Sequence, residues 1–264
     1  MVLKHYYQTL RWFHILKVIG SLIIMFAFLL LFLHAHLAIY AMAEESEASA
    51  SEPASEPEDI FAVALNPDRD YLIVINDDHE YIFGGEYDQA LQDDIVYVSD
   101  CYGDLTPIEK AANTAFSLLR QSLFEEGIYI QVYSAYRTRE DQEWVYDYYG
   151  HLEGWAETNK VSQAGFSEHH TGLLLNIMAL WPEVGIWATE TPVRSAEDPN
   201  FFGRIHASLA DFGFIDRYPE GKEEFTGCPC EPYEIRFVGS SKIAHEIMDN
   251  GLCLEEYLAK TQAP

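Results

Sequence analysis

The chain has 264 residues, of which 48% are hydrophobic and 14% aromatic, enough for one medium-sized packed domain with additional segments. Its 43 acidic and 16 basic residues give a formal net charge of −27. A surface this acidic repels phosphate backbones, so the composition excludes binding to nucleic acid and favours a soluble, self-repelling protein, which we expect to be a monomer.

The first 43 residues are typical of a membrane-inserting segment. Three basic residues precede an apolar run over residues 18–33 that continues to Ala43, and the first acidic residue is Glu44. The stretch is long enough to span a bilayer as an uncleaved transmembrane anchor. Ala41 to Ala43 also resemble the small-residue cleavage site of a signal peptide. Both alternatives place the rest of the chain outside the cytoplasm, either attached to the cell membrane or secreted.

An acidic tract follows over residues 44–60, rich in Glu, Ser, Ala and Pro. It has almost nothing apolar to bury, so it is predicted to be a disordered linker. The folded domain is therefore expected over residues 61–264.

Helical and strand patterns are interspersed through this domain without a regular βαβ alternation. Short strands are predicted over 71–76 and 80–83, followed by a helix from Thr106, as N-cap, to Gly127, with Pro107 in its first turn. An inner strand is predicted where β-branched and aromatic residues dominate. That strand covers 128–134, and the later pattern predicts helices over 138–149, 201–212, 240–249 and 254–259 and strands within 166–178 and 230–238. This order indicates an α+β fold with a mainly antiparallel central sheet flanked by helices.

Four cysteines follow the membrane segment and would lie in an oxidising compartment. A bond between Cys228 and Cys230 would be strained because only Pro229 separates them, so we expect one of the two to form a disulfide with Cys101 or Cys253. A zinc site on Cys-Pro-Cys is the alternative, although paired zinc ligands usually have two intervening residues.

Two segments about sixty residues apart carry the candidate site residues. They are SEHHTGLLLN, which begins at Ser167, and EPYEIRFVG, which begins at Glu231. An isolated histidine such as His169 is more often structural than a ligand, and carboxylates such as Glu231 and Glu234 are usually solvated. Residue types and spacing alone leave both a structural and a metal-binding role open.

The region from about Pro107 to the C-terminus resembles the zinc D-alanyl-D-alanine carboxypeptidases of the VanY type, which share a fold with lysostaphin-type peptidases and the hedgehog signalling domain. Five stretches match in the family's order. They are SAYRT followed by Gln142, GFSEHHTGL, FGFIDRYPEGK, EPYEIRFVG and LEEYL, beginning at residues 134, 165, 212, 231 and 254. The resemblance implies that fold, a zinc cofactor, and action on the D-alanine terminus of peptidoglycan stem peptides.

The same resemblance implies roles for five residues that match the family motifs. Glu231 matches the general base that takes a proton from zinc-bound water, and Arg137 matches the catalytic arginine that holds the substrate carboxylate. Gln142 and Ser167 match positions that contact substrate. His169 matches the first metal ligand.

Two metal-ligand positions depart from the family pattern. Asn176 stands where Ser-x-His-x6-Asp has its aspartate, and Glu234 stands where Glu-x-x-His has its histidine. The predicted ligand set His169, Asn176 and Glu234 keeps a formal charge of −1 but has one nitrogen donor in place of two, which shifts its preference from zinc towards harder ions. His170, where glutamine is usual, is an alternative imidazole, and we expect its side chain to point the other way.

Two functions of different class are consistent with these residues. One is a metallocarboxypeptidase that trims D-alanine from cell-wall peptides with an atypical metal site. The other is a pseudopeptidase that binds such peptides without efficient hydrolysis, since a fold can persist without its chemistry. Retention of Glu231 favours the enzyme, unless Glu231 is retained for packing or for hydrogen bonding to Arg236. The two substituted ligands favour the binding module.

Overall fold

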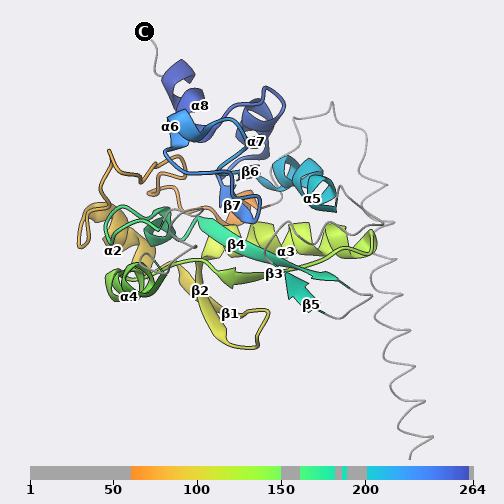
Figure 1. The fold of residues 1–264 in the computed structure, drawn as a ribbon, viewed down its shortest axis with the longest axis horizontal. Coiled ribbons are helices and arrows are strands. Elements are labelled where there is room, and N and C mark those ends of the chain that lie inside the picture. Colours follow the sequence, from red (N-terminus) through yellow and green to blue (C-terminus); the bar gives the residue numbers. More distant parts are fainter. Residues whose placement is uncertain (1–60, 150–160, 182–185, 189–200, 262–264) are drawn as a thin grey trace, which may run out of the picture. The chain divides into compact units, whose positions relative to one another are not determined.

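The computed structural model describes residues 61–149, 161–181, 186–188 and 201–261 (Figure 1). The predicted membrane segment over 1–43 and the predicted linker over 44–60 lie outside these ranges. The chain divides into residues 1–57 and residues 58–264, and all described residues belong to the second unit. None of the helices within the described ranges has the length and apolar character needed to cross a membrane.

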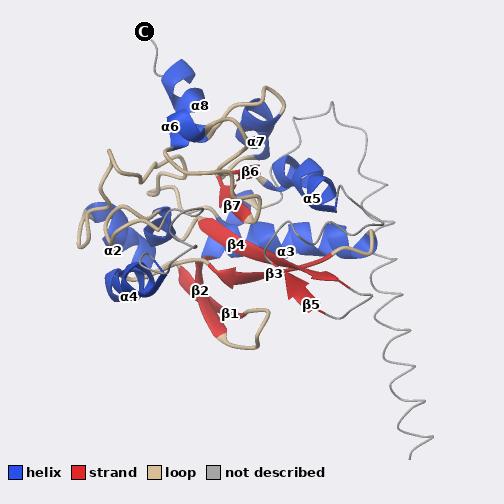
Figure 2. Cartoon of the chain, in the orientation of Figure 1, coloured by secondary structure: helices blue, strands red, loops and turns tan. Residues whose placement is uncertain are grey.

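The centre of the described domain is an antiparallel sheet (Figure 2). Four strands follow the order β3-β4-β7-β6, and β5 pairs with β4 as well. Every pairing in this sheet is antiparallel. The strands are β3 (Tyr129–Ser134), β4 (Leu174–Trp181), β5 (Ile186–Ala188), β6 (Phe214–Asp216) and β7 (Glu234–Phe237). Together with the helices described next, this confirms the predicted α+β fold with an antiparallel sheet.

A separate hairpin and several helices surround the sheet. The hairpin consists of β1 (Ile95–Ser99) and β2 (Leu105–Glu109). The α-helices of the described ranges are α2 (Glu86–Gln92), α3 (Lys110–Glu125), α4 (Arg139–Tyr149), α5 (Phe201–Leu209), α6 (Glu223–Thr226), α7 (Ser241–Met248) and α8 (Leu254–Thr261). Short 3-10 turns are η1 (Ala62–Ala64), η2 (Glu168–Thr171) and η3 (Ala210–Phe212).

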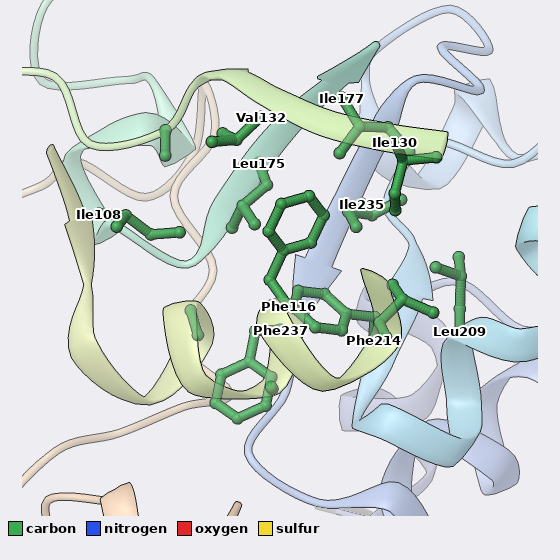
Figure 3. Close-up of a cluster of buried hydrophobic side chains, with 14 of the residues drawn as sticks. Ile108, Phe116, Ile130, Val132, Leu175, Ile177, Leu209, Phe214, Ile235 and Phe237 are labelled. Carbon is green, nitrogen blue, oxygen red and sulfur yellow. The ribbon is translucent and has the colours of Figure 1, made fainter. Parts of the chain in front are cut away.

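The main core lies between α3 and one face of the sheet (Figure 3). On α3, Phe116 is buried against Phe214, with ring centroids 6.4 Å apart. Each such fully buried apolar side chain stabilises the fold by about 1.5–3 kcal/mol. The sheet contributes alternate residues to this core: Ile130, Val132, Leu175, Ile177, Ile235 and Phe237.

The opposite face of the same strands forms the candidate site. Successive strand residues point to opposite faces, so Leu175 and Ile177 of β4 enter the core while Leu174, Asn176 and Met178 line a cavity. Likewise Glu234 of β7 lines the cavity. The period-two pattern of the strands therefore separates the core from the cavity.

The predicted start of the first long helix is wrong. Residues 105–109 form strand β2, in which Thr106 pairs with Val98, and α3 begins only at Lys110. The N-cap is Glu109, whose carboxylate accepts a hydrogen bond from the Ala112 N–H at 2.7 Å. The Thr-Pro pair resembles a helix start, and it therefore predicted an N-cap three residues too early. In the structure this pair lies in an extended strand, and Glu109 is the N-cap.

The predicted strands over 71–76 and 80–83 are also wrong. Between these segments the structure has one isolated antiparallel bridge, which joins Asn76 to His79. The apolar residues Leu72, Ile73 and Val74 are only partly buried and pack against three different clusters. Their apolar pattern therefore reflects packing and not pairing with another strand.

None of the four cysteines, all of which lie within the described ranges, forms a disulfide, which contradicts the predicted disulfide. The sulfur of Cys101 lies 3.2 Å from that of Met178 on β4. Cys253 is buried just before α8, and its N–H donates to Glu256 at 3.0 Å. The fold therefore gives these two cysteines other neighbours than the Cys228-Pro-Cys230 segment.

Candidate active site

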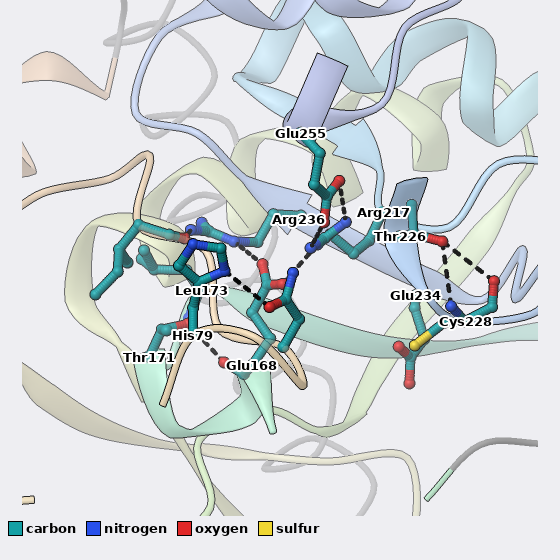
Figure 4. Close-up of polar contacts among 12 residues, drawn as sticks. His79, Glu168, Thr171, Leu173, Arg217, Thr226, Cys228, Glu234, Arg236 and Glu255 are labelled. Carbon is teal, nitrogen blue, oxygen red and sulfur yellow. Dashed lines mark hydrogen bonds and ion pairs between the residues drawn. The ribbon is translucent and has the colours of Figure 1, made fainter. Parts of the chain in front are cut away.

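The loop that carries His169 is fixed by a buried ionic network (Figure 4). Glu168 lies between two arginines of the sheet region: the Arg217 Nε donates to its carboxylate at 2.6 Å, and the Arg236 Nε donates to its other oxygen. Arg217 also pairs with Glu255 of α8 at 2.7 Å. Arg236 thus pairs with Glu168, and the alternative that Arg236 is the partner of Glu231 is wrong. The network ties η2 to the strands and to α8.

His169 directs one ring nitrogen into the cavity. Its Nδ1 lies 2.6 Å from the Ala135 carbonyl and must donate to it, so Nε2 is the nitrogen with a free lone pair. That Nε2 is buried, makes no hydrogen bond, and lies 3.8 Å from the Glu234 carboxylate. Burial, with the nearby Arg137 charge, lowers the pKa of His169 despite Glu234, which favours the neutral imidazole that a metal requires.

Asn176 lies beside Glu234 in the sheet. Cross-strand pairing places it between Ser134 of β3 and Glu234 of β7. Its Nδ2 donates to the Tyr133 hydroxyl at 3.1 Å, which leaves Oδ1 buried without a partner. Two acceptor atoms, His169 Nε2 and Asn176 Oδ1, are therefore orphaned on the cavity side.

The two glutamates of the second segment have opposite pKa shifts. Burial raises the pKa of Glu231 to about 9, with further contributions from the charge of Glu234 and a hydrogen bond to it. Burial acts in the same direction on Glu234, but His169 and Arg137 outweigh it and lower the pKa of Glu234. Of these two carboxyl groups, Glu231 therefore holds a proton more readily, and Glu234 ionises more readily.

Arg137 is held in a fixed orientation at the cavity wall. Its Nε donates to the Ser134 hydroxyl at 3.0 Å, and its Nη1 donates to the Gln142 side chain at 3.2 Å. Gln142 in turn donates to the Ser162 carbonyl at 2.7 Å. Burial lowers the pKa of the Arg137 guanidinium, although Glu234 opposes this. Since guanidinium groups have five N–H donors, Arg137 has donors beyond these two.

One cavity of about 380 Å³ brings the predicted site residues together. All seven line it: Arg137, Gln142, Ser167, His169, Asn176, Glu231 and Glu234. Its size and mixed apolar and polar lining suit a small ligand. The sequence prediction missed the tyrosines of the wall, which include Tyr133, Tyr218 and Tyr233. Tyr133 could have been found, because it alternates with the core residue Val132 on β3.

His170 points away from the cavity, as predicted. Its Nε2 accepts from the Gly165 N–H at 3.0 Å, and its Nδ1 donates to the Arg137 carbonyl at 2.8 Å. Both nitrogens are therefore occupied, and burial lowers the pKa of His170 to about 4. His170 links the loop to the Arg137 segment and does not replace a metal ligand.

His169 Nε2, Asn176 Oδ1 and the Glu234 carboxylate are the donor atoms of this cavity that could hold a cation. Within the described ranges, no group of three or more His, Cys, Asp or Glu side chains is placed to hold a metal. Asn176 would contribute a neutral amide oxygen, whose Oδ1 is buried without a hydrogen bond. His169 and Glu234 supply one imidazole nitrogen and one carboxylate, and an oxygen-rich set of this kind suits harder ions.

The VanY family, described as D-alanyl-D-alanine carboxypeptidase, matches residues 106–240 of this chain. A D-alanyl-D-alanine carboxypeptidase of Enterococcus faecalis is 38% identical over 152 residues, which cover 52% of each protein. The chain spans about half the length of the curated relatives it matches first, 55% and 52%.

Two solved structures are similar to the domain. One is a mutant of the vancomycin-resistance D,D-pentapeptidase VanY in complex with Zn(II), with 30% identity, a TM-score of 0.54, and coverage of 71% of this chain and 98% of that one. The other is VanYB in complex with D-alanine-D-alanine, with 28% identity, a TM-score of 0.54, and coverage of 72% and 97%. With five motifs in order, an antiparallel α+β fold and a family match over half of its length, the chain belongs to the VanY family of D-alanyl-D-alanine carboxypeptidases.

Proposed function

We propose that this protein acts on the D-alanine terminus of peptidoglycan stem peptides, as a carboxypeptidase with an atypical cation site formed by His169, Asn176 and Glu234. The convergence of the seven candidate residues on one cavity carries this proposal. Two relatives support it, because a VanY mutant binds Zn(II) and VanYB binds D-alanine-D-alanine. An anchor or cleaved signal within residues 1–43 would place the domain outside the cytoplasm, on the membrane or secreted, where it meets this substrate.

Substrate recognition would rest on Arg137. Its Nε and Nη1 donate to Ser134 and Gln142, so the side chain already has a fixed orientation. Binding of a ligand by its other N–H groups would therefore cost little further side-chain entropy. A guanidinium binds a carboxylate through charge-assisted and often bidentate hydrogen bonds, so a C-terminal carboxylate suits it. Gln142 and Ser167 line the same wall and would contact the terminal D-alanine.

Proton transfer would rest on Glu231. A divalent cation, when bound, lowers the pKa of a water molecule and polarises the peptide carbonyl. His169 Nε2, Asn176 Oδ1 and the Glu234 carboxylate would hold it, since the first two are buried without partners. The positive charge would also lower the raised pKa of Glu231 and leave it ionised, as a general base must be.

A second function, binding without efficient hydrolysis, is favoured by the same residues in their cation-free state. Asn176 supplies no anionic ligand, and Glu231 keeps a proton because its pKa is about 9. A protonated Glu231 does not accept a proton from water. The recognition residues Arg137 and Gln142 do not depend on the cation for their placement.

The experiment measures D-alanine release from a Lys-D-Ala-D-Ala peptide by the full chain, with zinc or manganese added and bound metal quantified. Release that is abolished in Glu231→Gln and retained in the exposed control Glu224→Gln would support the enzyme. Peptide binding without release would support the binding module. Neither binding nor release would contradict the proposal.

A further inference from the structure

His206 of α5 lies behind the turn that carries Glu231. Its Nε2 is 2.8 Å from the Pro232 carbonyl, and its Nδ1 is 3.1 Å from the Asp216 carboxylate of β6. The side chain is only 19% exposed. Both ring nitrogens therefore face oxygen atoms: Nε2 hydrogen-bonds the Pro232 carbonyl, and Nδ1 forms an ion pair with Asp216 when the imidazole is protonated.

The rest of this turn is held by main-chain bonds. The Glu231 N–H donates to the Tyr218 carbonyl at 3.2 Å, and the Glu234 N–H donates to the Glu231 carbonyl at 3.0 Å. The Tyr233 carbonyl accepts from Ile177 of β4 at 2.9 Å. Pro232 has no N–H, so its carbonyl is its one main-chain hydrogen-bonding group. His206 binds that carbonyl.

We propose that His206 is a positioning residue for Glu231: its imidazole joins Asp216 of the sheet to the Pro232 carbonyl and so fixes the turn on which the carboxyl group is presented to the cavity. This role rests on the proposed function of Glu231, but the order of the turn can be measured without any activity. His206 does not line the cavity and is not itself a catalytic residue.

The electrostatic surroundings of His206 favour its protonated form, which pairs with Asp216 while it donates to the Pro232 carbonyl. Burial alone would lower its pKa, but the nearby Asp216 carboxylate, together with the Pro232 carbonyl, outweighs burial and raises it. From its own helix, the ring of Phe202 lies 6.1 Å away and carries no charge. A histidine with a raised pKa stabilises the fold fully below its unfolded-state pKa, and loses that contribution as pH rises through the folded-state value.

The chain also contains a matched control. His245 of α7 lies between two carboxylates, at 2.9 Å from Asp211 and 3.2 Å from Asp249, and its pKa is raised as well, although burial alone would lower it. It does not line the cavity. Replacing His245 therefore removes a comparable histidine pairing without touching the Glu231 turn.

The test compares His206→Phe, His206→Gln and His245→Gln in the full chain by hydrogen exchange and by D-alanine release. His206→Phe should lower the protection of the Glu234 amide about tenfold, and kcat about tenfold with a smaller change in KM, because one hydrogen bond that aligns the base is lost. His206→Gln should retain the hydrogen bond to the Pro232 carbonyl and most of the protection of the Glu234 amide. In this variant, however, that protection should no longer fall as the pH rises. His245→Gln should change neither.

The outcomes distinguish a local from a general effect. Protection of the β3 and β4 core amides should stay unchanged in His206→Phe, since a merely structural role would lower protection everywhere. The proposal is overturned if Glu234 protection is unchanged in His206→Phe, or if it falls only in step with the core amides. If wild-type protein releases no D-alanine while Glu234 protection still falls, positioning by His206 stands and hydrolysis fails.

Discussion

Glu168 provides the sharpest test of how the site loop is held. Its side chain is fully buried between Arg217 and Arg236, whose side chains are also fully buried. Replacement by Gln preserves the shape but removes the charge that both guanidinium groups face. Breaking a buried ion pair by removing one partner costs about 3–5 kcal/mol, because a buried charge loses its compensation.

This loss of free energy corresponds to a measurable fall in the melting temperature, Tm. For a domain of this size, about 1 kcal/mol of destabilisation lowers Tm by about 2–4 °C, so Glu168→Gln should lower it by about 10 °C. The matched control is Glu255→Gln, whose side chain is 16% exposed and shares Arg217. Because Gln can still accept from Arg217 and water is near, that variant should lose about 1–2 kcal/mol.

Thermal unfolding of the full chain, followed by circular dichroism at one pH and salt concentration, gives both values. If Glu168→Gln melts no lower than Glu255→Gln, the ionic network does not stabilise the loop and the argument from burial is wrong. A Tm that falls as expected, with D-alanine peptide binding weakened as well, would connect the network to the cavity that Glu168 also lines.

Two further predictions concern the site itself. The double substitution Asn176→Asp with Glu234→His should raise zinc affinity at least about tenfold, because it replaces the neutral amide donor by a carboxylate and the Glu234 carboxylate by a second imidazole nitrogen at unchanged ligand charge. Calorimetry that detects no zinc binding would show that the cavity differs at other positions too. Burial lowers the pKa of His170 to about 4, from an unfolded-state pKa near 6.5. Its contribution to the free energy of unfolding is therefore fully present above pH 6.5 and is lost as the pH falls towards 4. His170→Gln should therefore remove part of the acid destabilisation in a Tm-versus-pH series, whereas unchanged acid sensitivity would refute this role.

The sequence predicted the sheet and the site better than the connections between them. The strand ending at Ser134 and the helix after Thr138 were predicted because their signals are local. The strand is rich in β-branched and aromatic residues, and the helix begins at a cap in which the Thr138 and Asp141 side chains each accept from the other residue's N–H. The convergence of His169, Asn176 and Glu234 depends on sheet pairing across about sixty residues, and only the family resemblance indicated it.

The failures have physical causes that a single sequence does not contain. Thr106 and Pro107 favour a helix start locally, but pairing with β1 makes them a strand. Cysteine content suggested a disulfide, but bonding depends on distances that only the fold sets. The partner of Arg236 was likewise undetermined until the fold placed Glu168 beside it.

Recognition of a terminal carboxylate by Arg137 is the central claim, and one titration tests it most directly. The Glu231→Gln protein, chosen to prevent turnover, is titrated calorimetrically with Lys-D-Ala-D-Ala as the free acid and as the C-terminal amide. We predict that the acid binds at least about tenfold more tightly, and that Arg137→Gln removes this difference, because a fixed guanidinium prefers a carboxylate. Equal binding of acid and amide, or no binding of either, would contradict the account.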